Sequence, residues 1–173
     1  VGSSPEVGAA LVDTKDVNMI SFTGSSQVGA KIMEAGGKSM KRLLMELGGK
    51  GALIMTEDCD VQSAVGGVAS VWGFHSGQIC TAPTRVICHR DIYEPTIQAL
   101  RAVSEFMTVG DAREEATLVG PVITESHRDR VEAFIQSGVD DGAEIIVGGE
   151  RPKRDGFFIA PTLLAGCTPD MHV

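Results

Sequence analysis

The sequence predicts an α/β fold, with mainly parallel open sheets flanked by helices. Strand-like and helix-like runs alternate along the 173 residues, and 21 glycines are spread between them. Alternation of this kind favours parallel strands that are joined through helices. The composition, with 43% hydrophobic and 22% charged residues, is that of a globular chain long enough to bury one core, or a core and part of another.

The first half of the chain predicts three strands and two helices. Val28, Ile32 and Ala35 recur at helical spacing, whereas apolar residues in the strand-like runs follow one another closely. Ser25 or Ser26 suits the start of one helix as a cap, and Asp60 suits the start of the other. The expected elements are a strand over 17–23, a helix over 26–35, strands over 41–47 and 52–55, and a helix over 60–72.

The second half continues the alternation. Ile97, Leu100 and Met107 mark one helical face, and Phe134 belongs to a second helix that the hydroxyl of Thr124 can cap. The expected elements are a strand over 84–89, helices over 93–107 and 124–138, and a strand over 143–147 that two glycines end.

Charge and cysteine spacing exclude several classes of protein. The formal net charge of −8 argues against a nucleic-acid partner, since phosphate binding relies on clustered Lys and Arg. No apolar stretch approaches the roughly 18 residues that a membrane span needs. Cys59, Cys80, Cys88 and Cys167 fit neither a zinc-knuckle spacing nor a dense disulfide framework. We therefore expect free thiols in a reducing compartment, hence a cytoplasmic protein, with no metal site and no membrane partner.

The segment 22–29 follows an expected strand and opens an expected helix. Gly24 lets the backbone turn sharply, and the free N–H groups of the first helical turn can face an anion. Ser25 adds a hydroxyl donor, so the turn suits the pyrophosphate of a dinucleotide. The pattern is neither G-x-G-x-x-G nor a loop that ends in G-K-[ST], and on this segment alone an ordinary turn is the better interpretation.

Glu46 ends an apolar strand, and Gly48 and Gly49 follow almost at once. Two bare backbone positions let a bulky ligand approach closely. Flanking by Leu44, Met45 and Leu47 predicts partial desolvation, which raises the pKa of a carboxyl towards the range of a general base. The alternative is a surface glutamate beside a glycine turn, which is the commoner outcome for a single Glu.

Cys80 follows a glycine-bearing turn and precedes an apolar strand. Its backbone N–H need not join a strand ladder, so it is free to stabilise an oxyanion on a carbon bonded to the sulfur. A buried structural thiol is the alternative, and we assign that role to Cys59, Cys88 and Cys167. His75 raises a third possibility, a Cys–His hydrolase, although a histidine at a helix end more often packs or caps locally.

Three motifs stand in order along the chain: Phe22-Thr23-Gly24-Ser25-x-x-x-Gly29, Glu46-Leu47-Gly48-Gly49-Lys50 and Gly77-Gln78-x-Cys80. Together they resemble the NAD(P)-dependent aldehyde dehydrogenase superfamily. Gly120-Pro121 and the segment 156–162 are similar to that family's pattern too. The resemblance covers essentially the whole chain, and its most specific feature is the pair of motifs that carry Glu46 and Cys80.

The resemblance implies a role for each motif residue. Cys80 is implied as the nucleophile that attacks the aldehyde carbon, and Glu46 as the base that activates water to hydrolyse the resulting thioester. NAD or NADP is implied as the cofactor and an aldehyde as the substrate. The residues implied to bind the cofactor are Thr23, Gly24, Ser25, Val28, Gly29 and Leu47.

The same resemblance implies two domains: the end of a Rossmann-like NAD(P)-binding domain over 1–46, and a truncated aldehyde dehydrogenase-like catalytic domain over 47–173. We expect an internal fragment that is nearly inactive alone, because the family's oxyanion-hole asparagine and ribose-binding residues are not in it. Exposed sheet edges predict self-association as a homo-oligomer. Two alternatives stay open, a coenzyme A-dependent acylating enzyme and a non-catalytic scaffold.

Overall fold

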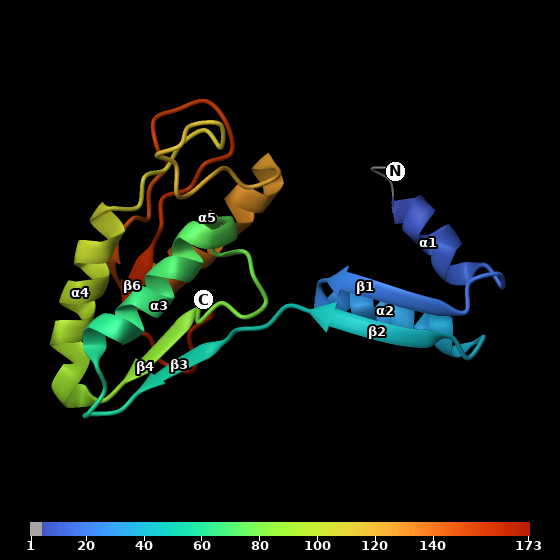
Figure 1. The fold of residues 1–173 in the computed structure, drawn as a ribbon, viewed down its shortest axis with the longest axis horizontal. Helices are drawn as coiled ribbons and strands as arrows, with labels where there is room; N and C mark the ends of the chain where they lie inside the picture. Colours follow the sequence, from blue (N-terminus) through green and yellow to red (C-terminus); the bar gives the residue numbers. More distant parts are fainter. Residues whose placement is uncertain (1–4) are drawn as a thin grey trace. The chain divides into compact units, whose positions relative to one another are not determined.

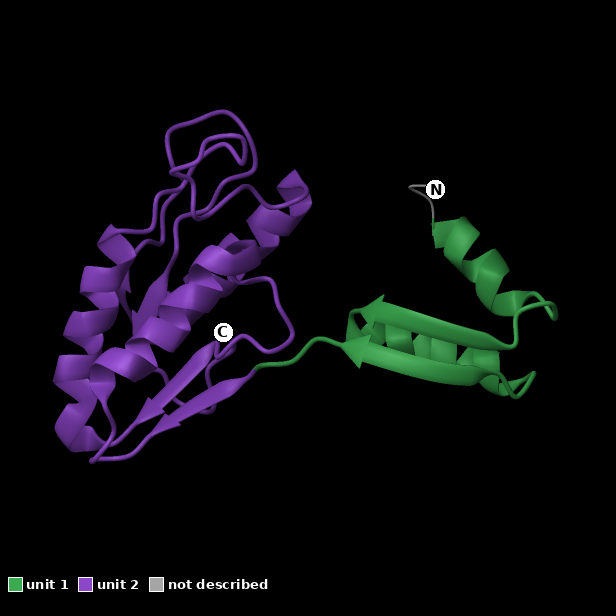
Figure 2. Cartoon of the chain, in the orientation of Figure 1, with its two compact units in different colours: residues 1–50 green, residues 51–173 purple. Residues whose placement is uncertain are grey.

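A computed structural model describes residues 5–173, and the chain divides into two compact units (Figure 2). Unit 1 is Val1–Lys50 and unit 2 is Gly51–Val173. Each unit has its own parallel strand pair, described separately below. The interpretation of residues 1–46 and 47–173 as a cofactor domain and a catalytic domain stays a prediction.

Unit 1 contains a helix followed by a strand–helix–strand unit. Its elements are α1 (Pro5–Asp13), β1 (Met19–Gly24), α2 (Ser26–Gly37) and β2 (Arg42–Leu47). The strands pair in parallel, from Met19 opposite Arg42 to Gly24 opposite Leu47. Burial alternates along both strands, so one face of the pair is half-buried and the other is exposed. Figure 1 shows α2 lying along the β1–β2 pair, as a crossover between parallel strands requires.

Two glycines let α2 approach β2 closely. A Cβ at Gly29 would lie 2.7 Å from Leu47 Cδ2, and a Cβ at Gly36 would lie 3.2 Å from Leu43 Cδ2. Both glycines are buried, together with Ile32 on the same helix. The close packing of helix on strand fixes where the first turn of α2 lies relative to the end of β2.

Unit 2 contains a second pair of parallel strands, together with several helices and a short antiparallel strand pair. Its elements are β3 (Ala52–Met55), α3 (Val61–Gly73), the 3-10 turns η1 (Phe74–Gly77) and η2 (Arg90–Ile92), β4 (Arg85–Cys88), α4 (Tyr93–Glu105), α5 (Glu125–Asp140), β5 (Glu144–Val147) and β6 (Leu163–Ala165). β3 and β4 are parallel, whereas β5 and β6 are antiparallel with an irregular register after Ile145. Figure 1 shows α3 and α4 running alongside each other. Apolar side chains from both helices form the core.

The core of unit 2 centres on Val65 and Val68 of α3 and Leu100 of α4. Half-buried apolar residues pack around these three: Leu53, Val61, Trp72, Val86, Ala99, Val103 and Leu163. Leu53 and Val86 come from β3 and β4, so the two helices cover one face of that strand pair. Asp60 begins α3 by accepting hydrogen bonds from the N–H groups of Gln62 and Ser63.

The predicted α/β class with mainly parallel pairing is confirmed. The nine expected strands and helices are also present, with each end within two residues of its predicted position. The chain also forms elements that the pattern did not predict. α1 has an apolar side that is mostly exposed, with Val12 as its buried residue, and β6 is three residues long. In the described part of the chain, no helix has both the length and the apolar character that membrane crossing demands.

Candidate functional site

Two of the sequence motifs meet at the carboxyl ends of β1 and β2. Thr23 pairs with Glu46 and Gly24 pairs with Leu47, and both Thr23 and Glu46 are exposed. Partners in a parallel register lie on the same face of a sheet, so these two side chains are neighbours. The N–H of Gly48 donates to the carbonyl of Gly24 at 3.2 Å, which extends the ladder one residue beyond the strands.

The start of α2 completes this group. Ser25 Oγ accepts a hydrogen bond from the N–H of Val28 at 3.3 Å, which leaves the hydroxyl hydrogen to donate elsewhere. Val28 is 42% exposed, an apolar surface beside the helix start. Gly29 is buried against Leu47, as described above. Unit 1 therefore brings together all six residues that the family resemblance implies for the cofactor: Thr23, Gly24, Ser25, Val28, Gly29 and Leu47.

The expected desolvation of Glu46 is wrong for unit 1, where its side chain is exposed. Met45 and Leu47 flank Glu46 in the sequence, yet successive residues of a strand point to opposite faces. Both leucine and methionine therefore face the half-buried side, and Glu46 shares the exposed side with Leu44 and Thr23. The alternation of side chains between the two faces of a strand, residue by residue, is the sequence signal that would have predicted an exposed Glu46.

Cys80 lies in unit 2, in an exposed loop between η1 and β4. Three successive residues before it have a left-handed backbone: His75 (φ 51°), Ser76 (φ 53°) and Gly77 (φ 74°). After them, Gln78 N–H donates to the His75 carbonyl and Ile79 N–H to the Gly77 carbonyl, each at 3.0 Å. Cys80 is exposed, and within residues 5–173 its N–H donates to no other group.

Two alternatives to Cys80 as the nucleophile, Cys88 and a pair with His75, gain no support from the structure, whereas the expectation of a buried thiol is wrong for Cys167, which is exposed. No disulfide links the described cysteines, and both Cys59 and Cys88, the latter on β4, are half-buried. Burial raises the pKa of the Cys88 thiol, which keeps it protonated. The His75 ring packs edge-on against Phe74, with centroids 4.4 Å apart. Across the described residues, no hydrogen bond connects the His75 imidazole with Cys80, so the Cys–His hydrolase gains no support.

Sequence reasoning missed Gly51, which holds the Cys80 loop. A Cβ at this position would lie closer than 3.0 Å to the carbonyl oxygen of Ala82, a separation that real Cβ atoms essentially never show. Ala82 is 4% exposed, and Arg85 N–H donates to the Gly51 carbonyl at 3.1 Å. The loop therefore packs backbone to backbone against the start of β3. A third glycine just after Gly48 and Gly49 was the available signal.

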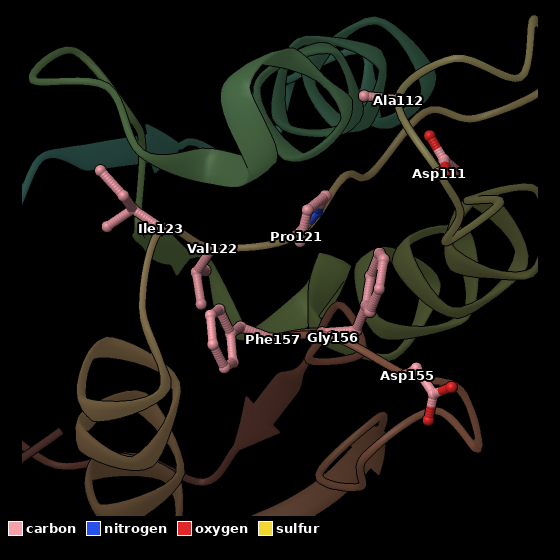
Figure 3. A pocket seen from close by; sticks show the side chains of 9 residues that line it. Asp111, Ala112, Pro121, Val122, Ile123, Asp155, Gly156 and Phe157 are labelled. Atoms are coloured by element: carbon pink, nitrogen blue, oxygen red, sulfur yellow. The ribbon is translucent and has the colours of Figure 1, made fainter.

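Unit 2 also has an open hollow of about 530 Å³ that contains none of the predicted site residues. Its lining residues come from three loops: Asp111, Ala112, Pro121, Val122, Ile123, Asp155, Gly156, Phe157 and Phe158. Figure 3 shows Phe157 beside Val122, and the N–H of Val122 donates to the Phe157 carbonyl at 2.9 Å. The hollow therefore lies where segments 120–123 and 155–158 are hydrogen-bonded to each other.

One group of side chains in unit 2 has the composition of a metal site. Glu57, His89 and Asp91 follow β3 and β4, and one ligand atom from each lies within 4.8 Å of the others. All three are exposed, and His89 Nδ1 already accepts the N–H of Asp91 at 3.3 Å. Exposed groups of this kind are common without an ion, and we assign no metal to them.

Comparison with known proteins identifies the family. The family model described as "Aldehyde dehydrogenase family" matches residues 1–173. The phenylacetaldehyde dehydrogenase of Pseudomonas fluorescens is 41% identical over 165 residues, which are 95% of this chain and 33% of that protein. The betaine aldehyde dehydrogenase of Brucella anthropi is 39% identical over 173 residues, covering 97% of this chain and 35% of that protein.

Solved structures agree with the sequence relatives. The NAD+ complex of an aldehyde dehydrogenase from Bacillus cereus superposes with a TM-score of 0.93 at 36% identity, covering 98% of this chain and 35% of that one. A betaine aldehyde dehydrogenase from Staphylococcus aureus with NAD+ gives a TM-score of 0.91 at 34% identity, covering 99% and 35%. The chain thus spans about a third of the length of these relatives. Its motifs, its fold and its match over residues 1–173 show that the chain belongs to the aldehyde dehydrogenase family.

Proposed function

We propose that the protein containing this chain oxidises an aldehyde to a carboxylic acid with NAD+ or NADP+. Cys80 is the nucleophile and Glu46 is the general base. The observation that carries the proposal is the state of Cys80: in a chain that matches the family throughout, this cysteine is exposed and its N–H is unbonded among the described residues.

Cys80 acts first. Its thiolate forms a C–S bond with the aldehyde carbon, and the carbonyl oxygen takes the negative charge. The N–H of Cys80 donates a hydrogen bond to that oxygen. A donor that is already oriented before the reaction stabilises the developing negative charge most effectively. A bound nicotinamide dinucleotide supplies the acceptor for the hydrogen and electron pair that leave the carbon, and Cys80 then carries a thioester.

Glu46 acts second. Its carboxylate takes a proton from a water molecule as the water oxygen attacks the thioester carbon. The C–S bond breaks, the carboxylic acid leaves and Cys80 returns to the thiolate. Gly48 and Gly49 support this role, because nothing lies within 4 Å of a Cβ placed at either position, and a ligand and a water can therefore approach beside Glu46.

The residues at the ends of β1 and β2 fit a dinucleotide. The Ser25 hydroxyl and the first-turn N–H groups of α2 are neutral donors that suit a pyrophosphate. Thr23 and Leu47 lie at the adjoining strand ends, and we assign them to the nicotinamide half of the dinucleotide, whereas exposed Val28 would offer apolar surface to the adenosine. Gly24 leaves room for the Phe22 ring at the turn, and Gly29 lets α2 pack against Leu47, which holds the first turn of α2 beside the strand ends.

We also infer how the units belong to the larger protein. Unit 1 is the end of its cofactor domain and unit 2 is most of its catalytic domain. The 173 residues alone have little dehydrogenase activity, because they span about a third of the length of the relatives. Exposed apolar side chains on both strand pairs, such as Leu44 and Ile54, support burial against further protein and a homo-oligomeric state.

The proposal is tested with two variants of the full-length protein in rapid mixing experiments that follow NADH or NADPH absorbance. Cys80→Ser should produce no reduced cofactor in the first turnover. Glu46→Gln should produce about one equivalent per active site and then stop, because the thioester forms but is not hydrolysed. Coenzyme A that restores turnover to Glu46→Gln would indicate the acylating enzyme instead. Wild-type rates in Cys80→Ser would overturn the proposal.

A further inference from the structure

We propose that Ser76 is a positioning residue: its hydroxyl, bonded to the carbonyl of Gly120, holds the left-handed turn 75–77 in the conformation that directs Cys80. This inference rests on the proposed function of Cys80. It also gives a role to the motifs Gly120-Pro121 and 156–162, which the proposed reaction leaves without one.

The turn 75–77 does not hold its conformation by itself. Glycine adopts a positive φ freely and histidine tolerates it, but serine rarely does so. Ser76 nevertheless has φ 53°, between His75 at 51° and Gly77 at 74°. A strained backbone of this kind persists only where the surrounding structure fixes it, and such strain gathers at functional sites.

The Ser76 side chain supplies a fixing contact. Its hydroxyl donates to the carbonyl oxygen of Gly120 at 3.1 Å, in a half-buried setting, across 44 residues of sequence. Among the described residues, the other hydrogen bonds of the turn are local: both the N–H and the side-chain amide of Gln78 donate to the His75 carbonyl at 3.0 Å. Ser76 therefore ties a local turn to a distant segment.

The acceptor at Gly120 is itself held on both sides. Before it, Leu118 and Val119 donate N–H hydrogen bonds to the Thr108 carbonyl at 2.9 and 3.0 Å. After it, the N–H of Val122 donates to the Phe157 carbonyl at 2.9 Å.

Segment 156–158, on the far side of this contact, is also fixed. The guanidinium of Arg128, a buried residue of α5, donates to the Gly156 carbonyl at 3.4 Å and lies 5.9 Å from the Phe157 ring centroid. Phe158 is buried and lies beneath the guanidinium of Arg154 at 4.8 Å. The chain of contacts thus runs from Arg128 through Gly156 and Val122 to Gly120, and ends at the turn before Cys80.

Loss of the Ser76 hydroxyl should therefore misdirect the nucleophile. Cys80 is four residues beyond Ser76, and the turn sets the direction of both its thiol and its N–H. Misplacement of a reacting group by about 1 Å costs on the order of 100-fold in rate. We expect a loss of about 10- to 100-fold in the rate of the first turnover, with the KM for aldehyde almost unchanged.

Three substitutions in the full-length protein separate this role from simple folding. Ser76→Ala removes the donor. Ser76→Gly removes the donor and also relieves the strain, which keeps a folded protein available if the alanine variant unfolds. Ser76→Asn tolerates a left-handed backbone and retains a donor for the Gly120 carbonyl, so it should recover most of the rate. Ser70→Ala is the matched control, because within residues 5–173 the Ser70 hydroxyl donates to the nearby Gly67 carbonyl of α3 and to no distant segment.

Two measurements read the result: the rate of the first NADH-forming turnover, and the rate at which iodoacetamide alkylates Cys80. Slower rates in the alanine and glycine variants, with recovery in Ser76→Asn and no change in Ser70→Ala, support the proposal. Wild-type rates in Ser76→Ala, or equal losses in Ser76→Ala and Ser76→Asn, overturn it. The alkylation rate needs no turnover, so it still tests Ser76 if Cys80→Ser proves active and the proposed function fails.

Discussion

Replacement of Gly51 by alanine should disturb the Cys80 loop more than any comparable change of one methyl group. The new Cβ would lie under 3.0 Å from the Ala82 carbonyl oxygen, which belongs to backbone and cannot rotate away. Ala82 is 4% exposed, so the loop has little room to move. Relief of the overlap requires a shift of about half an ångström or more, and overpacking of this kind typically costs about 1–3 kcal/mol.

The consequence for activity follows from the position of Cys80, two residues before Ala82. A shift of the loop carries the thiol with it, and we expect the first-turnover rate of Gly51→Ala to fall about 10-fold or more. Gly66→Ala is the control. Gly66 is an exposed position within α3 where a Cβ meets nothing within 4 Å, and alanine there should stabilise the helix by about 0.5–1 kcal/mol.

Thermal unfolding and iodoacetamide alkylation of Cys80 measure both effects in the full-length protein. Gly51→Ala should melt at a lower temperature and alkylate at an altered rate, whereas Gly66→Ala should melt higher with the wild-type alkylation rate. If Gly51→Ala keeps both the stability and the alkylation rate of the wild type, the packing of Gly51 against Ala82 does not fix the loop, and the reasoning fails.

Three further outcomes are expected. Ser25→Ala removes the cap of α2, so the free energy of unfolding should fall by about 1 kcal/mol in denaturant titrations and the Kd for NAD+ should rise; an unchanged value of both would contradict the role of the cap. The hydrogen bond from the Ser63 hydroxyl lowers the pKa of Asp60 in the folded protein. The ionised Asp60 carboxylate therefore stabilises the fold above the pKa of an unfolded aspartate, about 4, and this stabilisation is lost as the pH falls through the lower pKa of the folded state. Asp60→Asn keeps a helix cap that does not titrate, so the free energy of unfolding of this variant should depend less on pH in that acid range than that of the wild type. Equal pH slopes for the two proteins would contradict this role of Asp60. Iodoacetamide at neutral pH should label exposed Cys80 before half-buried Cys88, whose pKa is raised by burial, and peptide mass spectrometry would reveal the reverse order if this is wrong.

Local chemistry explains which parts of the fold could be predicted. The caps at Ser25, Asp60 and Thr124 are signals carried by one residue and its next three, and all three cap their helices. Helical and strand periodicity likewise depends on close neighbours. The short strand β6 lacks such a signal, because its three residues are held by pairing with β5, which comes 16 or more residues earlier.

The site was only partly predictable, for the same physical reason. The motif residues of unit 1 could be grouped because the ends of parallel strands meet at one edge, and Thr23 does pair with Glu46. The exposure of Glu46 was misjudged because its sequence neighbours were treated as spatial neighbours. The contacts of Gly51 with Ala82 and of Ser76 with Gly120 join segments 31 and 44 residues apart, and no local pattern encodes them.

The most direct test of Cys80 as the nucleophile is to identify the residue that carries the acyl group. Glu46→Gln in the full-length protein is mixed with aldehyde and NAD+, quenched in acid and analysed by peptide mass spectrometry. We predict one added acyl mass, located on the peptide that contains Cys80 and absent when Cys80→Ser is added to the same variant. An acyl group on another residue, or none after a full equivalent of NADH has formed, would contradict the account.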